Sequence, residues 1–170
     1  MNNIDTAINN NDTRQGIFFG VNSGILTTVG VIAGISQTTT NPMYVVISVL
    51  SLAISDCIGE AYGMYLSKKA ELVKEKGYGP VYSLVAVFVA KFITVLLFLL
   101  PLLFYWNLKY FKNLSWPIIY SLIVLIFIDH RLAEMRKESK IKYIGTHVIL
   151  LIIVVLSTKI IGQVLSKYKK

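Results

Sequence analysis

Five long runs of apolar residues, separated by turn-forming residues, constrain this chain more than any other feature of its sequence. They span about residues 17–35, 43–66, 81–106, 116–130 and 143–165. A bilayer with a hydrocarbon core about 30 Å thick accommodates helices of about 20 such residues. Hydrophobic residues make up 55% of the chain and charged residues only 15%, a balance that excludes an ordinary soluble domain. The sequence therefore predicts an all-α, polytopic membrane protein with five transmembrane helices.

The fourth run is the shortest of the five. Its purely apolar part has about a dozen residues, so a full crossing must continue through Asp129 and His130 or lie in a locally thinned bilayer. Turn and helix-start signals, such as Asn41-Pro42, separate the runs. We expect residues 1–15 to form a flexible tail, residues 16–166 the transmembrane domain and residues 167–170 a basic tail.

Lysine and arginine are unevenly distributed between the predicted loops. With five crossings, one side of the membrane carries Arg14, the lysines from Lys68 to Lys76 and the basic stretch from Arg131 to Lys142, and these outnumber the basic residues of the other side. The positive-inside rule then puts the N-terminus in the cytosol and the C-terminus in a lumen or outside. Because topology accounts for the net charge of +8, we do not expect nucleic-acid binding.

Two acidic residues, Asp56 and Glu60, lie well inside the second run. An ionisable side chain there costs roughly 2.5–3.5 kcal/mol even on insertion scales and is rarely kept without a use. The spacing of four places both on one helical face, which Met64 extends by another turn. Carboxylate oxygens and a thioether suit ferrous iron or manganese better than an alkali ion. The pattern predicts part of a transport path for a divalent metal ion.

Lys91 in the third run offers a second interpretation of these acids. It lies eleven residues after Pro80, and Asp56 lies eleven before Ser67, so an antiparallel hairpin brings Lys91 and Asp56 to similar depth. An ion pair would neutralise both charges, and the sequence leaves open whether metal or a proton displaces it during a transport cycle. Two carboxylates sharing one site repel each other, which favours protonation of one of them and allows metal and proton to exchange.

Small residues recur every fourth position in the first two runs, at Gly20 and Gly24 and again at Gly59 and Gly63. Such ladders let helices approach closely, and we expect them to serve packing. Three further side chains of the first run could offer neutral oxygen atoms to an ion, namely Asn22, Ser23 and Thr27.

Short motifs follow one another in a recognisable order along these runs. Residues 18–36 read Phe-Phe-Gly-Val-Asn-Ser-Gly-Ile-Leu-Thr-Thr and end in Ala-Gly-Ile-Ser, residues 59–67 read Gly-Glu-Ala-Tyr-Gly-Met-Tyr-Leu-Ser, and residues 160–162 read Ile-Ile-Gly. The first is similar to Gly-x-x-Asp-Gly-Leu-x-Thr with a later Ala-Gly-x-Ser, and the second to Ser-Met-x-x-Gly-Glu-Tyr-x-Ser. In order and spacing, residues 16–166 resemble the vacuolar iron transporter family.

The resemblance implies a five-helix subunit that forms a homodimer in a vacuolar or other endomembrane. It also implies export of ferrous iron, and often manganese, from the cytosol in exchange for protons, with no permanently bound cofactor. Ser23 stands where the family has a metal-binding Asp, and Asp56 would have to supply that charge from the facing helix. The connection from Lys68 to Gly79 is too short for the family's cytosolic metal-binding domain and is similar to that of its nodulin-like branch.

Enzymatic chemistry has no recognisable signature in the sequence. There is no phosphate-binding glycine loop, no nucleophile with a plausible partner and no Cys-x-x-Cys pair, since Cys57 is the single cysteine. We therefore expect a metal transporter rather than an enzyme. The alternatives are a transport-silent membrane scaffold or partner protein of the same fold and, as a third class, a small-ion channel.

Overall fold

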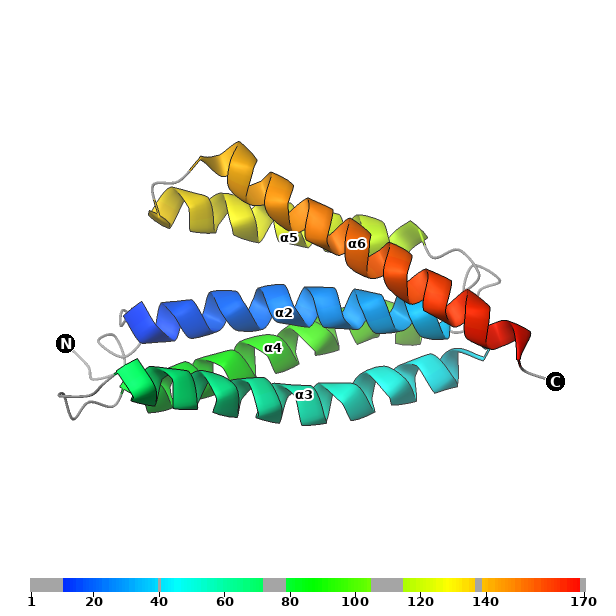
Figure 1. The fold of residues 1–170 in the computed structure, drawn as a ribbon, viewed down its shortest axis with the longest axis horizontal. Helices are drawn as coiled ribbons and strands as arrows, with labels where there is room; N and C mark the ends of the chain where they lie inside the picture. The colour runs from blue at the N-terminus through cyan, green and yellow to red at the C-terminus, as the bar shows by residue number, and fades with distance from the viewer. Residues whose placement is uncertain (1–10, 40, 72–78, 105–114, 137–138, 169–170) are drawn as a thin grey trace. The chain divides into compact units, whose positions relative to one another are not determined.

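The structure is a computed structural model, and the residues described are 11–39, 41–71, 79–104, 115–136 and 139–168. In these residues all the regular structure is α-helical, and Figure 1 shows the helices in chain order. They are α2 (Asn11–Ile35), α3 (Pro42–Glu71), α4 (Gly79–Phe104), α5 (Ser115–Arg136) and α6 (Lys140–Lys167). For the part of the chain that the structure describes, the prediction of an all-α protein with five helices is confirmed.

Four of these helices are long and apolar enough to cross a membrane, as judged by length and composition. They are α2, α3, α4 and α6, whereas α5 is not among the candidates found in the described residues. The chain is thus an integral membrane protein with four candidate spans.

The helices extend beyond the predicted apolar runs at several ends. Helix α2 begins at Asn11, so residues 11–15, which the sequence analysis assigned to the tail, are helical. The rest of that tail, residues 1–10, lies outside the described residues, as do residues 105–106 of the predicted third span and residues 169–170. Helix α3 begins at Pro42, whose fixed φ suits a first helical position. The Asn41 side chain accepts a hydrogen bond from the Met43 amide at 2.9 Å and caps this helix.

The described residues belong to two compact units. The first unit contains the beginning of α2 up to Gly24, the part of α3 from Ser51 onward and α4 up to Leu96. The second contains the rest of α2, the beginning of α3, the end of α4, and all of α5 and α6.

In the first unit, three glycines of α2 face α4. A Cβ on Gly16 would lie 2.8 Å from the Ser83 carbonyl oxygen, one on Gly20 would lie 2.6 Å from the Val87 carbonyl oxygen, and one on Gly24 would lie 3.1 Å from Thr94 Cβ. Glycines further along α2 meet residues further along α4, so the two helices run parallel here. Any larger residue at these positions would push the two backbones apart.

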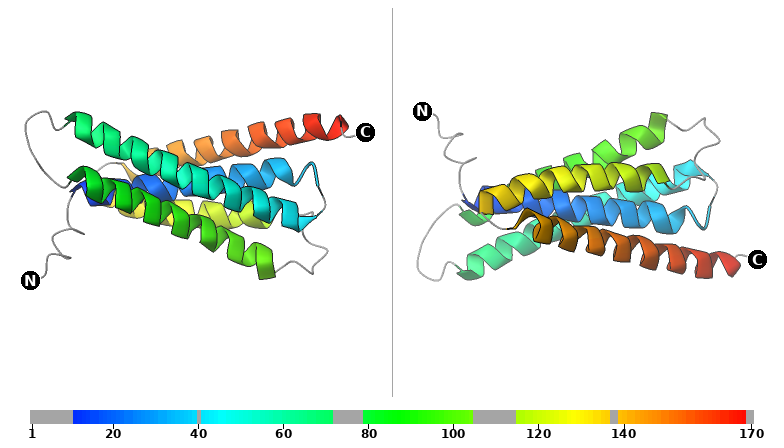
Figure 2. Two further views of the ribbon diagram at one scale, coloured as in Figure 1. Left: turned by 90° about the horizontal axis from the view of Figure 1, so that it is seen from below. Right: turned by 90° about the horizontal axis from the view of Figure 1, so that it is seen from above.

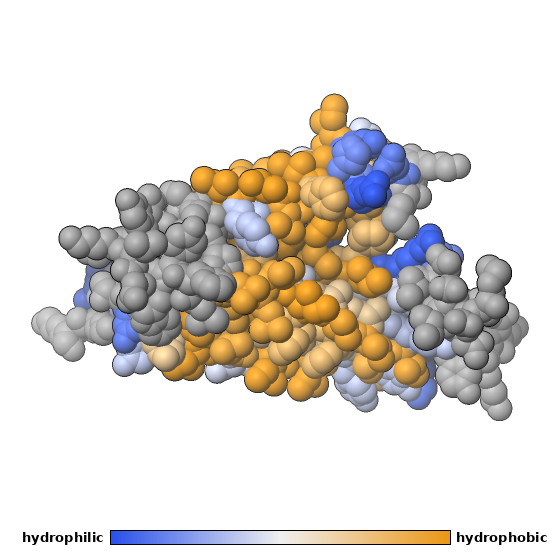
Figure 3. Space-filling model, turned by 180° about the vertical axis from the view of Figure 1, so that it is seen from behind, coloured by the Kyte–Doolittle hydropathy of each residue, from blue (hydrophilic) through white to orange (hydrophobic). Residues whose placement is uncertain are grey.

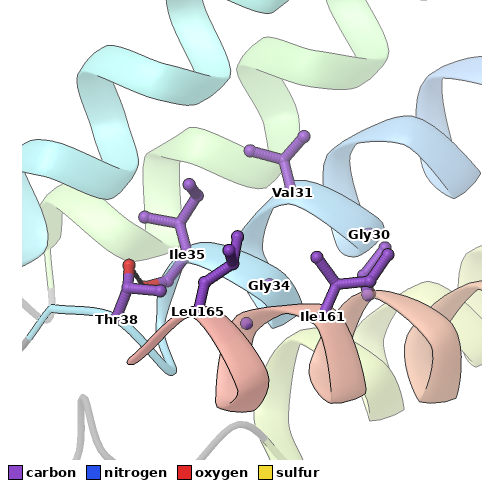
Figure 4. A pocket seen from close by; sticks show the side chains of 9 residues that line it. Gly30, Val31, Gly34, Ile35, Thr38, Ile161 and Leu165 are labelled. Carbon is purple, nitrogen blue, oxygen red and sulfur yellow. Dashed lines mark hydrogen bonds between the residues drawn. The ribbon is translucent and has the colours of Figure 1, made fainter. Parts of the chain in front are cut away.

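In the second unit, α5 and α6 form an antiparallel hairpin, which the views of Figure 2 also show. The end of α2 packs along α6 through small residues, because Gly34 lies against Thr158 and Gly162 lies against the Gly34 carbonyl. Figure 4 shows the crevice of about 240 Å³ beside this contact, lined almost wholly by apolar groups that include Val31, Ile35 and Leu165.

Large apolar side chains cover much of the surface. Phe127 is 66% exposed, Ile123 63% and Ile160 59%. Apolar residues also dominate the face shown in Figure 3. Apolar surface on this scale matches a lipid environment.

Candidate functional site

The candidate site is a cluster of charged side chains in the first unit, centred on Lys91 of α4. Its side chain is fully buried, with an exposed fraction of 0%. Its ammonium nitrogen lies 2.5 Å from Asp56 Oδ2 and 2.8 Å from Glu60 Oε2, both on α3. The same nitrogen donates a hydrogen bond to Ser23 Oγ on α2 at 2.8 Å. Three helices therefore converge on one cationic centre, which we call the Lys91 cluster: Ser23, Asp56, Glu60 and Lys91.

Each acid of the cluster is held by its position on α3. Because Asp56 and Glu60 are four residues apart, they project from one helical face and meet the same ammonium group. Their side chains are 26% and 27% exposed, so part of each carboxylate lies at the surface of the chain. The cluster is closed on the side of Lys91 and accessible on the side of α3.

Ser23 forms hydrogen bonds with both Glu60 and Lys91. Its hydroxyl oxygen accepts from Lys91 and lies 2.7 Å and 2.6 Å from the two carboxylate oxygens of Glu60, to which it donates its one proton. The position depends on the glycines on either side, because Gly20 and Gly24 bring α2 against Lys91 and Thr94 of α4. Glycines that the sequence predicts to serve packing thus also set the geometry of the cluster.

Three other predicted site residues make no hydrogen bond with the Lys91 cluster in the described part of the chain. The side-chain oxygen of Asn22 is buried without a hydrogen-bond partner among the described residues. Met64 is half-buried on α3, one turn beyond Glu60. Thr27 is half-buried on α2 and belongs to the second unit.

Gly59 and Gly63 differ from the glycines of α2. Among the described residues, no atom lies within 4 Å of where a Cβ would be at either position. The ladder that we expect to pack against another helix is therefore open on a single chain, on the same helix as Asp56 and Glu60.

A metal ion in this cluster would rely on few charged ligands. In the described residues no group of three or more His, Cys, Asp or Glu side chains could hold a metal ion. The two carboxylates of the cluster would therefore have to be completed by neutral oxygen atoms such as that of Ser23, or by groups from outside the chain. They carry one negative charge in excess of the Lys91 ammonium.

The sequence analysis missed a second buried pair, Asp129 on α5 and His147 on α6. Asp129 is fully buried, and its Oδ1 lies 2.7 Å from His147 Nδ1. The ring of Tyr143 lies edge-on to the imidazole, with 4.8 Å between the ring centroids. A signal was present in the spacing, since Asp129 and His147 are each nine positions from residue 138, between the two helices. Lys91 and Asp56 are equidistant from their own turn in the same way, at eleven residues from Pro80 and Ser67.

Comparison with known proteins does not assign the chain to a family. No protein-family model matches the chain, and neither the curated proteins nor the solved structures contain a match.

Proposed function

We propose that this chain is a membrane transporter for a divalent transition metal, ferrous iron or manganese. The observation that carries the proposal is the Lys91 cluster, in which Asp56, Glu60 and Ser23 surround one cationic position on helices that can span a membrane. Charged groups inside a span are expensive and usually mark an ion or proton path. Because both acids are partly exposed, an ion can reach them from the α3 side.

The chemistry of the cluster favours a divalent metal exchanged for protons. Carboxylate oxygens bind iron and manganese well, and the half-buried Met64 could offer a thioether one turn further on. Asp56 and Glu60 meet at one cationic position, where a metal ion and protons would compete for the same carboxylate oxygen atoms. A proton entering from an acidic lumen would then replace the metal.

The proposed architecture is that of a short-loop relative of the vacuolar iron transporters. It has five crossings, of which α5 is the short one, with the N-terminus in the cytosol of a vacuolar or other endomembrane. It functions as a homodimer. The open positions at Gly59 and Gly63 support this assembly, because a second copy could approach α3 closely there.

A transport-silent scaffold of the same fold is the alternative, and one observation favours it. The Lys91 ammonium already has three oxygen partners, one each on Ser23, Asp56 and Glu60. A permanent ion pair of this kind satisfies the buried charges without any transported ion.

Transport by the purified chain in liposomes separates these functions. We expect Mn²⁺ or Fe²⁺ to move across the vesicle membrane at a rate that increases with an imposed pH gradient, whereas K⁺ does not move. A K⁺ conductance without metal flux would identify a channel. Vesicles without flux of either ion would favour the scaffold.

A further inference from the structure

The ammonium group of Lys91 has the coordination of a bound cation. An ammonium has three N–H donors, and each has one oxygen partner here, on Ser23, Asp56 and Glu60, at 2.5–2.8 Å. The three oxygen atoms come from two other helices, α2 and α3. Lys91 contributes the cation, and the rest of the cluster forms an oxygen cage around it.

Charge makes this ammonium a competitor of any divalent ion. Without Lys91 the two carboxylates carry two negative charges, which one divalent cation neutralises completely. With Lys91 in place only one negative charge remains, and an arriving divalent ion is also repelled by the ammonium a few ångströms away. The same oxygen atoms therefore cannot hold both cations well.

The two sides of the cage are unequally accessible. Lys91 is 0% exposed, whereas Asp56 and Glu60 are 26% and 27% exposed. An external ion can therefore meet the carboxylates on their α3 side while the ammonium still holds them from the α4 side. The ion need not pass the lysine to displace it.

We propose that Lys91 is a tethered occupant of the cation site, whose ammonium excludes divalent cations until it withdraws from Asp56 and Glu60. This inference rests on the proposed function, because it assigns a regulation to the same site. It implies that removal of the ammonium converts the cluster into a better site for a divalent ion.

Binding of Mn²⁺ to the full chain in nanodiscs tests the proposal in two variants. Lys91→Ala empties the position, and Lys91→Met fills most of its space without a charge. We expect both to bind one Mn²⁺ per chain at least about tenfold more tightly than the wild type, since a unit charge has left the immediate surroundings of the ion. Asp56→Asn combined with Lys91→Ala should lose this gain. Equal Mn²⁺ affinity of the wild type and both variants would overturn the proposal.

A rescue by small amines keeps the test decisive where Lys91→Ala folds poorly. Methylammonium has N–H donors and can refill the cage, whereas tetramethylammonium has the same charge but no N–H donor. We expect methylammonium, but not tetramethylammonium, to raise the unfolding temperature of Lys91→Ala, with no such effect on the wild type. An equal response to both amines, or to neither, contradicts the tethered cation.

The outcomes also separate this inference from the proposed function. Tight Mn²⁺ binding by the Lys91 variants together with an absence of flux in wild-type liposomes would refute transport and retain the tethered cation. Flux in the wild type together with unchanged Mn²⁺ affinity in the variants would refute the tethered cation and retain transport.

Discussion

Ser23 and Lys91 are joined by a hydrogen bond of 2.8 Å from the lysine ammonium to the serine hydroxyl. The bond places α2 in the same polar cluster as α3 and α4. By the proposed relationship, Ser23 stands where vacuolar iron transporters have a metal-binding Asp. A serine gives the lysine an oxygen partner without adding a third negative charge, which suits a site that already contains its own cation.

Replacement of this serine should weaken the fold as well as the site. Ser23→Ala removes one acceptor from Lys91 and one donor from Glu60, both inside the bundle. We expect a loss of about 1–3 kcal/mol in the free energy of unfolding, the usual cost of leaving such a group unsatisfied. Reversible unfolding in mixed micelles measures it. Ser55→Ala is the matched control, because the exposed Ser55 hydroxyl bonds only to carbonyls of its own helix, and an equal loss there would contradict the assigned role.

The close packing of α2 on α6 predicts a strong difference between two glycines of α6. A Cβ on Gly162 would overlap the Gly34 carbonyl oxygen and would lie 2.9 Å from Gln37 Cβ, whereas one on Gly145 would have no atom of the described residues within 4 Å. We expect Gly162→Ala to lower the free energy of unfolding by about 1–3 kcal/mol through overpacking. Gly145→Ala should leave it unchanged or raise it, since alanine favours the helix. Similar losses in both variants would refute the packing argument.

The open glycine ladder of α3 predicts the face of the proposed dimer. Gly59→Leu introduces a side chain where a single chain has space, so it should leave the fold of the monomer intact. We expect it to lower the dimeric fraction at least about tenfold, because close helix approach in a membrane depends on small residues. Cross-linking or single-molecule photobleaching in liposomes measures that fraction. Ser157→Leu on the exposed face of α6 is the control, and a dimer that survives Gly59→Leu would exclude this face.

Asp129 and His147 should be energetically coupled. A double-mutant cycle with Asp129→Ala and His147→Ala isolates their interaction, and we expect about 1.5–3 kcal/mol for a buried hydrogen bond to a charged group. Arg131 and Glu134 provide the control cycle, because their charged groups are 3.9 Å apart and their side chains are 67% and 55% exposed. An exposed pair of this kind contributes about 0–1 kcal/mol. A coupling energy no larger for Asp129 and His147 would show that their contact does not stabilise α5 on α6.

Much of the fold follows from simple features of the sequence. The apolar runs fix the number of helices, and the spacing of four between Asp56 and Glu60 directs both to one partner. Equal distances from a turn bring Lys91 to the depth of Asp56. The same rule applied to the hairpin of α5 and α6 would have found His147 opposite Asp129.

The remaining features depend on how the helices pack. Ser23 reaches the ammonium only because Gly20 and Gly24 let α2 lie close to α4, and small residues alone do not specify which helix they will face. The helix ends do not follow from the apolar runs, since hydrophobicity marks where a bilayer could begin and not where backbone hydrogen bonding begins. Polar residues from Asn11 onward therefore continue α2 beyond its apolar run.

Metal flux in liposomes through the wild type and through an Asp56→Asn variant tests the central claim most directly. If the carboxylates of the Lys91 cluster bind the transported ion, the substitution should reduce the Mn²⁺ flux at least about a hundredfold, because one of two essential charges has left the site. Glu71→Gln, at the exposed end of the same helix, should transport at the wild-type rate. Equal flux in all three proteins would contradict the account.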